Sequence, residues 1–193
     1  PEEPYVVMRF VSRTANHDIG HSGLSDETKI EAVSAFARFG NEFITSEDPL
    51  PDAIEQHRVS FPPERIHHVL AFARLCYGES ATMSSEAAVL GTPAVYLDDE
   101  GRGYTTEQEE SYELVYNYSE SKKDQRVSIH KGTELLQVSK EVFEQRRQAM
   151  LKDKIDVTAF MVWFVENYPD SKKKYRKTNG KILGRKKWGT RQK

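Results

Sequence analysis

Residues 78–97, GESATMSSEAAVLGTPAVYL, contain the residue types that an anion-binding helix start requires. A helix that begins near Ser80 presents unpaired backbone N–H groups and the positive end of its dipole at Ser80, Ala81 and Thr82. Small side chains there let a phosphate approach the backbone, and the two hydroxyls add hydrogen-bond donors. Glu86 lies one turn further on, on the same face as Thr82, where a carboxylate suits a ribose diol. We therefore predict that the helix start binds a diphosphate and that Glu86 binds a ribose.

A simpler interpretation assigns these residues to helix capping. Ser80 or Thr82 would then be an N-cap, Gly91 the C-cap, and Glu86 an exposed helix residue. The helix is apolar nearly all round, which predicts that it is buried, and a buried glutamate needs a partner. That expectation favours a functional site. We include Glu79 in the site because it follows an expected strand at its carboxyl end.

The loop after the first expected strand, residues 12–22, offers a second group of chemically capable side chains. Arg9 and Arg13 could neutralise a diphosphate, and His17 could act as a general acid or base near neutral pH. Asp18 is the one carboxylate of the loop. We predict phosphate binding by Arg9 and catalytic contacts with a sugar by Arg13, His17 and Asp18; a structural loop with capping roles is the alternative.

Two histidines of this loop, His17 and His21, have the four-residue spacing of a metal-binding pair. Gly20 interrupts a helix between them, and the neighbouring sequence offers no third ligand. We therefore expect no metal at this loop, and no cofactor beyond the substrate nucleotide itself.

Strand-like and helix-like segments alternate along the chain and must position these groups. We predict strands at 5–11, 41–45, 75–77, 94–97 and 114–118, and helices at 26–39, 62–75, 80–90, 105–112, 129–150 and 153–167. Such alternation predicts an α/β fold: a single Rossmann-like domain with a mostly parallel sheet and helices on both faces. We place this domain at residues 1–169 and a basic tail at 170–193.

Charge is distributed unevenly along the chain. The net charge is −2, but residues 171–193 hold 11 Lys and Arg and no Asp or Glu, which leaves 17 basic and 30 acidic side chains for residues 1–170. The acidic body argues against a nucleic-acid-binding core. The basic tail predicts contact with an anionic membrane surface, with nucleic acid or a merely solvated tail as alternatives.

Three features bear on the compartment. The single cysteine, Cys76, excludes an internal disulfide and favours a reducing environment. The first residues, PEEPYVV, lack the basic and apolar regions of a signal peptide, and no apolar run approaches the roughly 20 residues that span a bilayer. We expect a cytoplasmic protein that is peripheral at the inner membrane face.

The spacing G-x-S-x-x-x-x-x-E-A-x-x-L-G-T-P at residues 78–93 resembles the nucleotide-binding half of GT-B-type proteins, which include many glycosyltransferases and UDP-N-acetylglucosamine 2-epimerase. Together with VVMRFVSRTANHDIGHSGLS, FITSE and IDVTAFMVWFVENYP, it is similar to a prokaryotic GT-B-like family of unknown function over residues 4–169. The resemblance implies phosphate contacts at 80–82, a ribose contact at Glu86 and base contacts near 61–65.

The chain corresponds to the second half of such proteins, and its loop 12–22 lacks the His-Arg-Arg-Glu motif of the epimerase. The resemblance therefore predicts a UDP-sugar-binding domain of a glycosyltransferase-like protein in surface glycan synthesis. Such a domain would turn over little without an N-terminal Rossmann half that holds the acceptor. A nucleotide-sugar epimerase or hydrolase relative, and a non-catalytic nucleotide-binding or scaffold module, are the alternatives.

Overall fold

The computed structural model describes residues 3–12 and 23–177. The chain divides into two compact units, Pro1–Arg147 and Gln148–Lys193, which we call the sheet unit and the C-terminal unit. The sequence predicts a boundary at residue 169 instead. The sheet unit holds every described residue that the sequence assigns to a ligand site.

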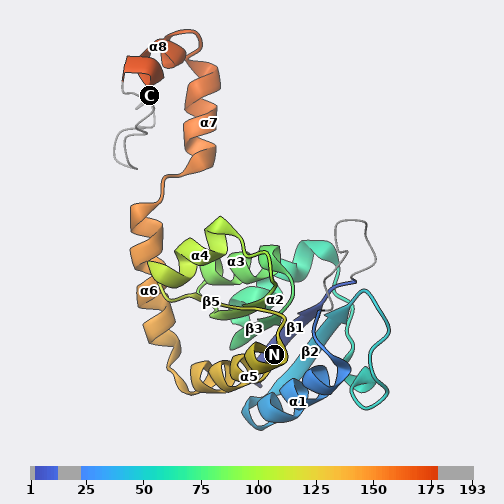
Figure 1. Ribbon diagram of the computed structural model, residues 1–193. Coiled ribbons are helices and arrows are strands. Elements are labelled where there is room, and N and C mark those ends of the chain that lie inside the picture. The colour runs from blue at the N-terminus through green and yellow to red at the C-terminus, as the bar shows by residue number, and fades with distance from the viewer. Residues whose placement is uncertain (1–2, 13–22, 178–193) are drawn as a thin grey trace. The chain divides into compact units, whose positions relative to one another are not determined.

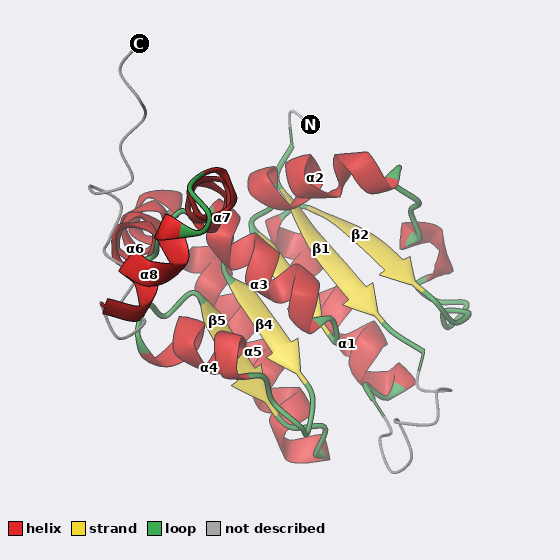
Figure 2. Ribbon diagram, turned by 90° about the horizontal axis from the view of Figure 1, so that it is seen from above, coloured by secondary structure: helices red, strands yellow, loops and turns green. Residues whose placement is uncertain are grey.

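The sheet unit is built on five parallel strands (Figures 1 and 2). The strands are β1 (Tyr5–Phe10), β2 (Asn41–Ser46), β3 (Leu75–Gly78), β4 (Ala94–Leu97) and β5 (Val115–Tyr118). Their order across the sheet is β2-β1-β3-β4-β5, and all neighbours pair in parallel. This confirms the predicted α/β fold, and each strand begins within one residue of its expected position.

Helices cover both faces of the sheet, as the Rossmann-like prediction requires (Figure 1). One face carries α1 (Asp26–Phe36) and α5 (Lys122–Gln137), and the other carries α2 (Ile66–Phe72), α3 (Ala81–Leu90) and α4 (Gly103–Glu110). Short 3-10 turns occupy Ala37–Phe39, Glu55–His57 and Pro63–Arg65. A further helix, α6 (Lys140–Asp153), starts in the sheet unit and ends in the C-terminal unit.

The core lies between the sheet and its helices. Because both faces of the sheet are covered, the inner strands β1, β3 and β4 are short and mostly apolar, and residues 6–8 of β1 are fully buried. On α5, the Ser128 hydroxyl lies 2.8 Å from the Tyr77 hydroxyl of β3. A Cβ atom on Gly132 of α5 would lie 2.7 Å from the Phe36 ring, so the glycine lets α5 pack closely against α1.

The strand order reverses between β1 and β3. The chain passes from β1 to β2 on one side, and then returns to place β3 on the other side of β1. In open parallel sheets, ligands bind outside the carboxyl ends of the strands at such a reversal. The fold therefore predicts a ligand site at the carboxyl ends of β1, β2 and β3.

The C-terminal helices differ from the sequence prediction. The sequence predicts two helices over 129–150 and 153–167, whereas three are present: α5, α6 and α7 (Val157–Glu166). Helix α5 begins at Lys122 because the Ser121 side chain caps it by accepting from the backbone N–H of Asp124 at 3.2 Å. It ends where Val138 adopts an extended backbone. A serine followed three residues later by an acidic residue is a capping signal, so this start was predictable.

The C-terminal unit contains α7 and α8 (Asp170–Lys177), and α8 is helical where the sequence predicts a tail. The Ser171 hydroxyl donates to the Phe164 carbonyl at 2.6 Å. The Tyr175 ring packs against Phe160 and Phe164, with ring centroids 6.2 and 6.4 Å apart. These contacts explain why the first basic residues join a helix. Within 3–12 and 23–177, no helix has the length and apolarity needed to cross a membrane.

Candidate functional site

The ends of β2, β1 and β3 are neighbours where the strand order reverses. The register places Arg9 of β1 beside Thr45 of β2 on one side and beside Gly78 of β3 on the other. Arg9 therefore lies at the centre of this edge, between the two strands that lead to the other candidate groups.

Gly78 sets the close approach of β3 to β1. It has a φ of 141°, a backbone conformation that residues with a side chain rarely adopt. A Cβ atom at this position would lie 2.0 Å from the Arg9 carbonyl oxygen. Its absence lets the next backbone N–H, that of Glu79, donate to the same carbonyl at 2.9 Å. The glycine thus brings the start of α3 directly against the end of β1.

The start of α3 is a capped helix N-terminus. The Ser80 hydroxyl accepts from the backbone N–H of Met83 at 3.3 Å, and Gly91 ends the helix with a φ of 91°, so the capping interpretation of both residues is confirmed. The N–H groups in the first turn of any helix have no intrahelical acceptor. Phosphate binding at Ser80, Ala81 and Thr82 is compatible with the cap, because the Ser80 hydroxyl can accept from Met83 and still donate, and it stays a prediction.

The expectation that α3 is buried all round is wrong. Thr82 and Val89 are exposed, and the Glu86 side chain is 38% exposed. One Glu86 carboxylate oxygen lies 3.5 Å from Nε2 of His67 on α2. Helix α3 packs against the sheet, α2 and α4, and this packing leaves its outer side open to solvent. Glu86 is thus an accessible carboxylate rather than a buried charge that requires a ligand, and its ribose contact stays a prediction.

Glu79 links the start of α3 to the loop after β1. It is 5% exposed, and its Oε1 accepts from the backbone N–H of Leu24 at 2.7 Å while Oε2 accepts from that of Val11 at 3.1 Å. Val11 and Leu24 flank the loop that carries the predicted catalytic residues. The structure therefore gives Glu79 an anchoring role, and its contact with a ligand stays a prediction.

Sequence reasoning missed Glu47, which follows β2. Its carboxylate pairs with the Arg9 guanidinium, and its Oε2 accepts from the backbone N–H of Ser12 at 2.9 Å. This contact holds the Arg9 side chain over the edge of the sheet. Nothing local in FITSE indicates it, because the two partners are 38 residues apart and meet only once β1 and β2 pair.

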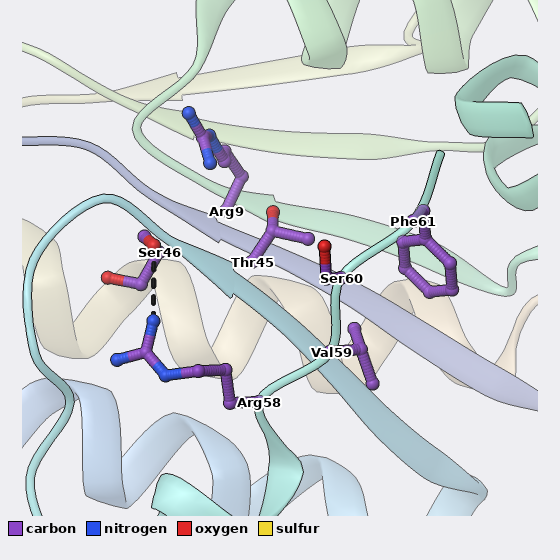
Figure 3. Close-up of a pocket in the computed structure, with 7 residues that line it drawn as sticks. All are labelled: Arg9, Thr45, Ser46, Arg58, Val59, Ser60 and Phe61. Atoms are coloured by element: carbon purple, nitrogen blue, oxygen red, sulfur yellow. Dashed lines mark hydrogen bonds between the residues drawn. The ribbon is translucent and has the colours of Figure 1, made fainter. Parts of the chain in front are cut away.

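A cavity of about 570 Å³ opens at the ends of β1 and β2 (Figure 3). Two guanidinium groups, three hydroxyls, a valine and an aromatic ring line it: Arg9, Thr45, Ser46, Arg58, Val59, Ser60 and Phe61. Cationic, hydroxyl and aromatic groups together suit a ligand that has anionic and aromatic parts. The base contacts implied for residues 61–65 overlap this pocket at Phe61, whereas nothing in the sequence indicates that Arg58 lines it.

Arg58 is fixed in the pocket wall by several partners. Its guanidinium donates to the Ser46 carbonyl at 3.2 Å (Figure 3). It also pairs with Glu55 at 2.5 Å and donates to the Asp48 carbonyl at 3.0 Å. The hydrogen bond to Glu55 raises the pKa of Arg58, so the group is charged at any physiological pH. The Arg58 backbone also forms a parallel bridge with Ile44 of β2.

Three predicted catalytic residues, Arg13, His17 and Asp18, lie outside the described residues. Their contacts with a sugar stay predictions. Among residues 3–12 and 23–177, no group of three or more His, Cys, Asp or Glu side chains could hold a metal ion.

Comparisons with known proteins give no family assignment. No family model matches the chain, and no curated protein matches it at a significant level. Among solved structures, it is similar to CalG4, the calicheamicin glycosyltransferase, with 20% identity and a TM-score of 0.49 over 75% of this chain and 38% of that one. It is also similar to the glycosyltransferase of kitacinnamycin, with 15% identity and a TM-score of 0.43 over 73% of this chain and 38% of that one. The chain thus spans well under half the length of either protein.

Proposed function

We propose that the chain binds a nucleoside diphosphate sugar, UDP-linked, as the nucleotide-binding part of a glycosyltransferase-like protein of surface glycan synthesis. The observation that carries this proposal is the juxtaposition of a capped helix start and a pocket lined by two arginines at one sheet edge. Arg9 joins the two, because its strand neighbours are Thr45, which lines the pocket, and Gly78, which precedes the helix. A diphosphate that links a base to a sugar would bridge the same two features.

Each part of such a ligand has a matching group at this edge or on α3, the helix that starts there. The base lies against Phe61, whose ring meets Phe43 edge-on with centroids 6.0 Å apart. Arg9 and the first-turn N–H groups of α3 bind the diphosphate. The Glu86 carboxylate accepts from the ribose hydroxyls. It does so at little cost, because the ion pair that it gives up with His67 is exposed and exposed pairs are weak.

The same groups suit glycosyl transfer. When the bond between the sugar and the diphosphate breaks, negative charge develops on the leaving diphosphate. The Arg9 guanidinium and the α3 start stabilise that charge from fixed positions. Arg13, His17 and Asp18 serve the sugar side, as the sequence predicts. An N-terminal Rossmann half supplies the acceptor, so this chain alone binds the nucleotide and turns over little.

Calorimetric titration of UDP, with CDP, GDP and UMP beside it, tests the proposal. We expect selective binding of UDP, and weaker binding of UMP because it lacks the second phosphate. Arg9→Gln should weaken UDP binding by about 1.5–3 kcal/mol, the usual worth of a hydrogen bond to a charged group. Arg38→Gln is the matched control, because Arg38 is exposed and packs on Phe39, with its guanidinium carbon 4.9 Å from the ring centroid.

The possible outcomes separate the parts of the proposal. No binding of any nucleotide at millimolar concentration would reject a nucleotide site on this chain. Equal binding of UDP, CDP and GDP would reject the uridine assignment and retain the diphosphate site. Equal losses in the Arg9 and Arg38 variants would show that the binding depends on general charge rather than on this edge.

A further inference from the structure

Helix α7 of the C-terminal unit presents a stripe of exposed aliphatic side chains. Val157, Met161, Val162 and Val165 are 57%, 59%, 50% and 73% exposed. The spacing of positions 157, 161 and 165 is that of one helix face, and 162 lies beside it. Tyr168, just beyond the helix end, is 60% exposed. Contiguous exposed apolar side chains on a helix mark a binding surface more often than single exposed ones do.

The stripe belongs to an ordered helical hairpin (Figure 1). Asp156 caps α7 by accepting from the backbone N–H of Ala159 at 2.9 Å. The other side of α7 carries Phe160 and Phe164, which pack with Tyr175 of α8. The hairpin has therefore used one side of α7 for its own packing, and the aliphatic stripe remains on the outside.

Exposed cations follow directly after the stripe. Lys172, Lys173, Lys174 and Arg176 of α8 are all exposed, and of these Lys173 pairs with Asp170 at 2.9 Å. The basic composition extends along the sequence, since residues 171–193 hold 11 Lys and Arg and no acidic residue. The C-terminal unit thus combines an aliphatic surface with an excess of positive charge.

We propose that the C-terminal unit docks the protein on an anionic lipid bilayer, with the α7 stripe in the interface and the α8 cations on the lipid phosphates. An in-plane helix that pairs apolar and basic surface is the usual form of such an anchor. α7 has 10 residues and lies on the membrane rather than crossing it. RNA would engage the cations but would leave the aliphatic stripe without a partner. A protein groove would cover the stripe without requiring this excess of positive charge.

Co-sedimentation of the full chain with lipid vesicles tests the proposal. We expect binding to vesicles of equal parts phosphatidylcholine and phosphatidylglycerol, and little binding to phosphatidylcholine alone. Combined Lys172→Glu, Lys173→Glu and Lys174→Glu should lower the partition coefficient by at least about 100-fold, at roughly fivefold for each cation near the surface. The charge control is Lys122→Glu with Lys123→Glu, at exposed positions on α5, which should bind like the wild type.

A second set of variants tests the stripe. Combined Met161→Gln, Val162→Gln and Val165→Gln should lower partitioning by roughly tenfold for each side chain that enters the apolar phase. Phe72→Gln, Val89→Gln and Val127→Gln replace apolar residues of the sheet unit that are 63%, 42% and 42% exposed, and they should leave partitioning unchanged. UDP titration of the same variants separates membrane docking from the nucleotide site.

Several results would overturn the proposal. One is equal binding to neutral and anionic vesicles. Another is unchanged vesicle binding after the stripe is replaced. A third is self-association that the stripe variant abolishes, because α7 would then be an interface between copies of the chain. Binding of single-stranded RNA without vesicle binding would likewise assign the cations to a different partner.

Discussion

The close approach of β3 to β1 predicts that Gly78→Ala is strongly destabilising. The alanine Cβ would lie 2.0 Å from the Arg9 carbonyl oxygen and 2.9 Å from its carbon. Both atoms belong to the backbone of β1, an interior strand of the sheet, so no flexible side chain can move aside. The residue would also keep a φ of 141°, which suits glycine.

Two costs contribute to the expected loss of stability. Holding a non-glycine residue in a sparsely populated backbone conformation costs about 1–3 kcal/mol. Displacing a packed backbone to make room costs about another 1–3 kcal/mol. We therefore expect the free energy of unfolding to fall by about 4 kcal/mol. Because the displacement separates the α3 start from Arg9, UDP affinity should also fall by at least about tenfold.

Urea unfolding followed by circular dichroism measures the stability change, and calorimetry measures the affinity. Gly103→Ala is the matched control, because a Cβ atom there meets nothing within 4 Å, and Gly103 opens α4. That variant should be neutral, or more stable by up to about 1 kcal/mol from helix propensity. A Gly78→Ala protein within about 0.5 kcal/mol of the wild type would refute the reasoning.

Two further predictions concern buried carboxylates. Glu79→Ala should lower the free energy of unfolding by about 2–5 kcal/mol, because the backbone N–H groups of Val11 and Leu24 lose their acceptor. Glu79→Gln keeps one acceptor oxygen and should lower it less. Equal urea midpoints for the two variants would contradict this explanation. Burial raises the pKa of Glu42, and this effect outweighs the opposite effect of the nearby His57. The unfolded chain therefore loses this proton at a lower pH than the folded protein does. As a result, the free energy of unfolding falls as pH rises above the ordinary pKa of a glutamate. Glu42→Gln should therefore be more stable than the wild type at pH 7, and the difference should vanish as pH falls below the ordinary pKa of a glutamate. Urea unfolding at several pH values measures this difference. A difference that does not change with pH would show that the ionisation of Glu42 is not its cause.

Much of the fold could be predicted because its determinants are local. Strands β1, β3 and β4 are short, mostly apolar runs, and the prediction for Ala94–Leu97 matches β4 to the residue. The end of α3 at Gly91 was equally predictable, since glycine followed by Thr-Pro stops a helix. The break between α5 and α6 was missed because the apolar pattern continues across it. Ser121 and the extended Val138 mark the true ends of α5.

The candidate site was less predictable because its contacts are not local. Arg9 was expected to bind phosphate, but its partner Glu47 becomes visible only when β1 pairs with β2. The sequence places Glu79 at the ligand, yet its burial and its two backbone donors depend on where Val11 and Leu24 lie beside the end of β3. The exposure of Glu86 depends on how α2 and α4 flank α3, which the composition of one helix does not reveal.

The pocket wall at Arg58 and Val59 has a consequence for solubility. β2 stands at the end of the strand order, and edge strands present free backbone groups that recruit strands of other molecules. Here the bridge from Arg58 to Ile44, and the hydrogen bond from the Val59 N–H to the Ile44 carbonyl at 2.9 Å, occupy part of that edge. The segment that shapes the pocket therefore also shields the sheet against intermolecular pairing. Substitutions that loosen it for the sake of a new ligand would expose an aggregation-prone edge before the rest of the domain unfolds.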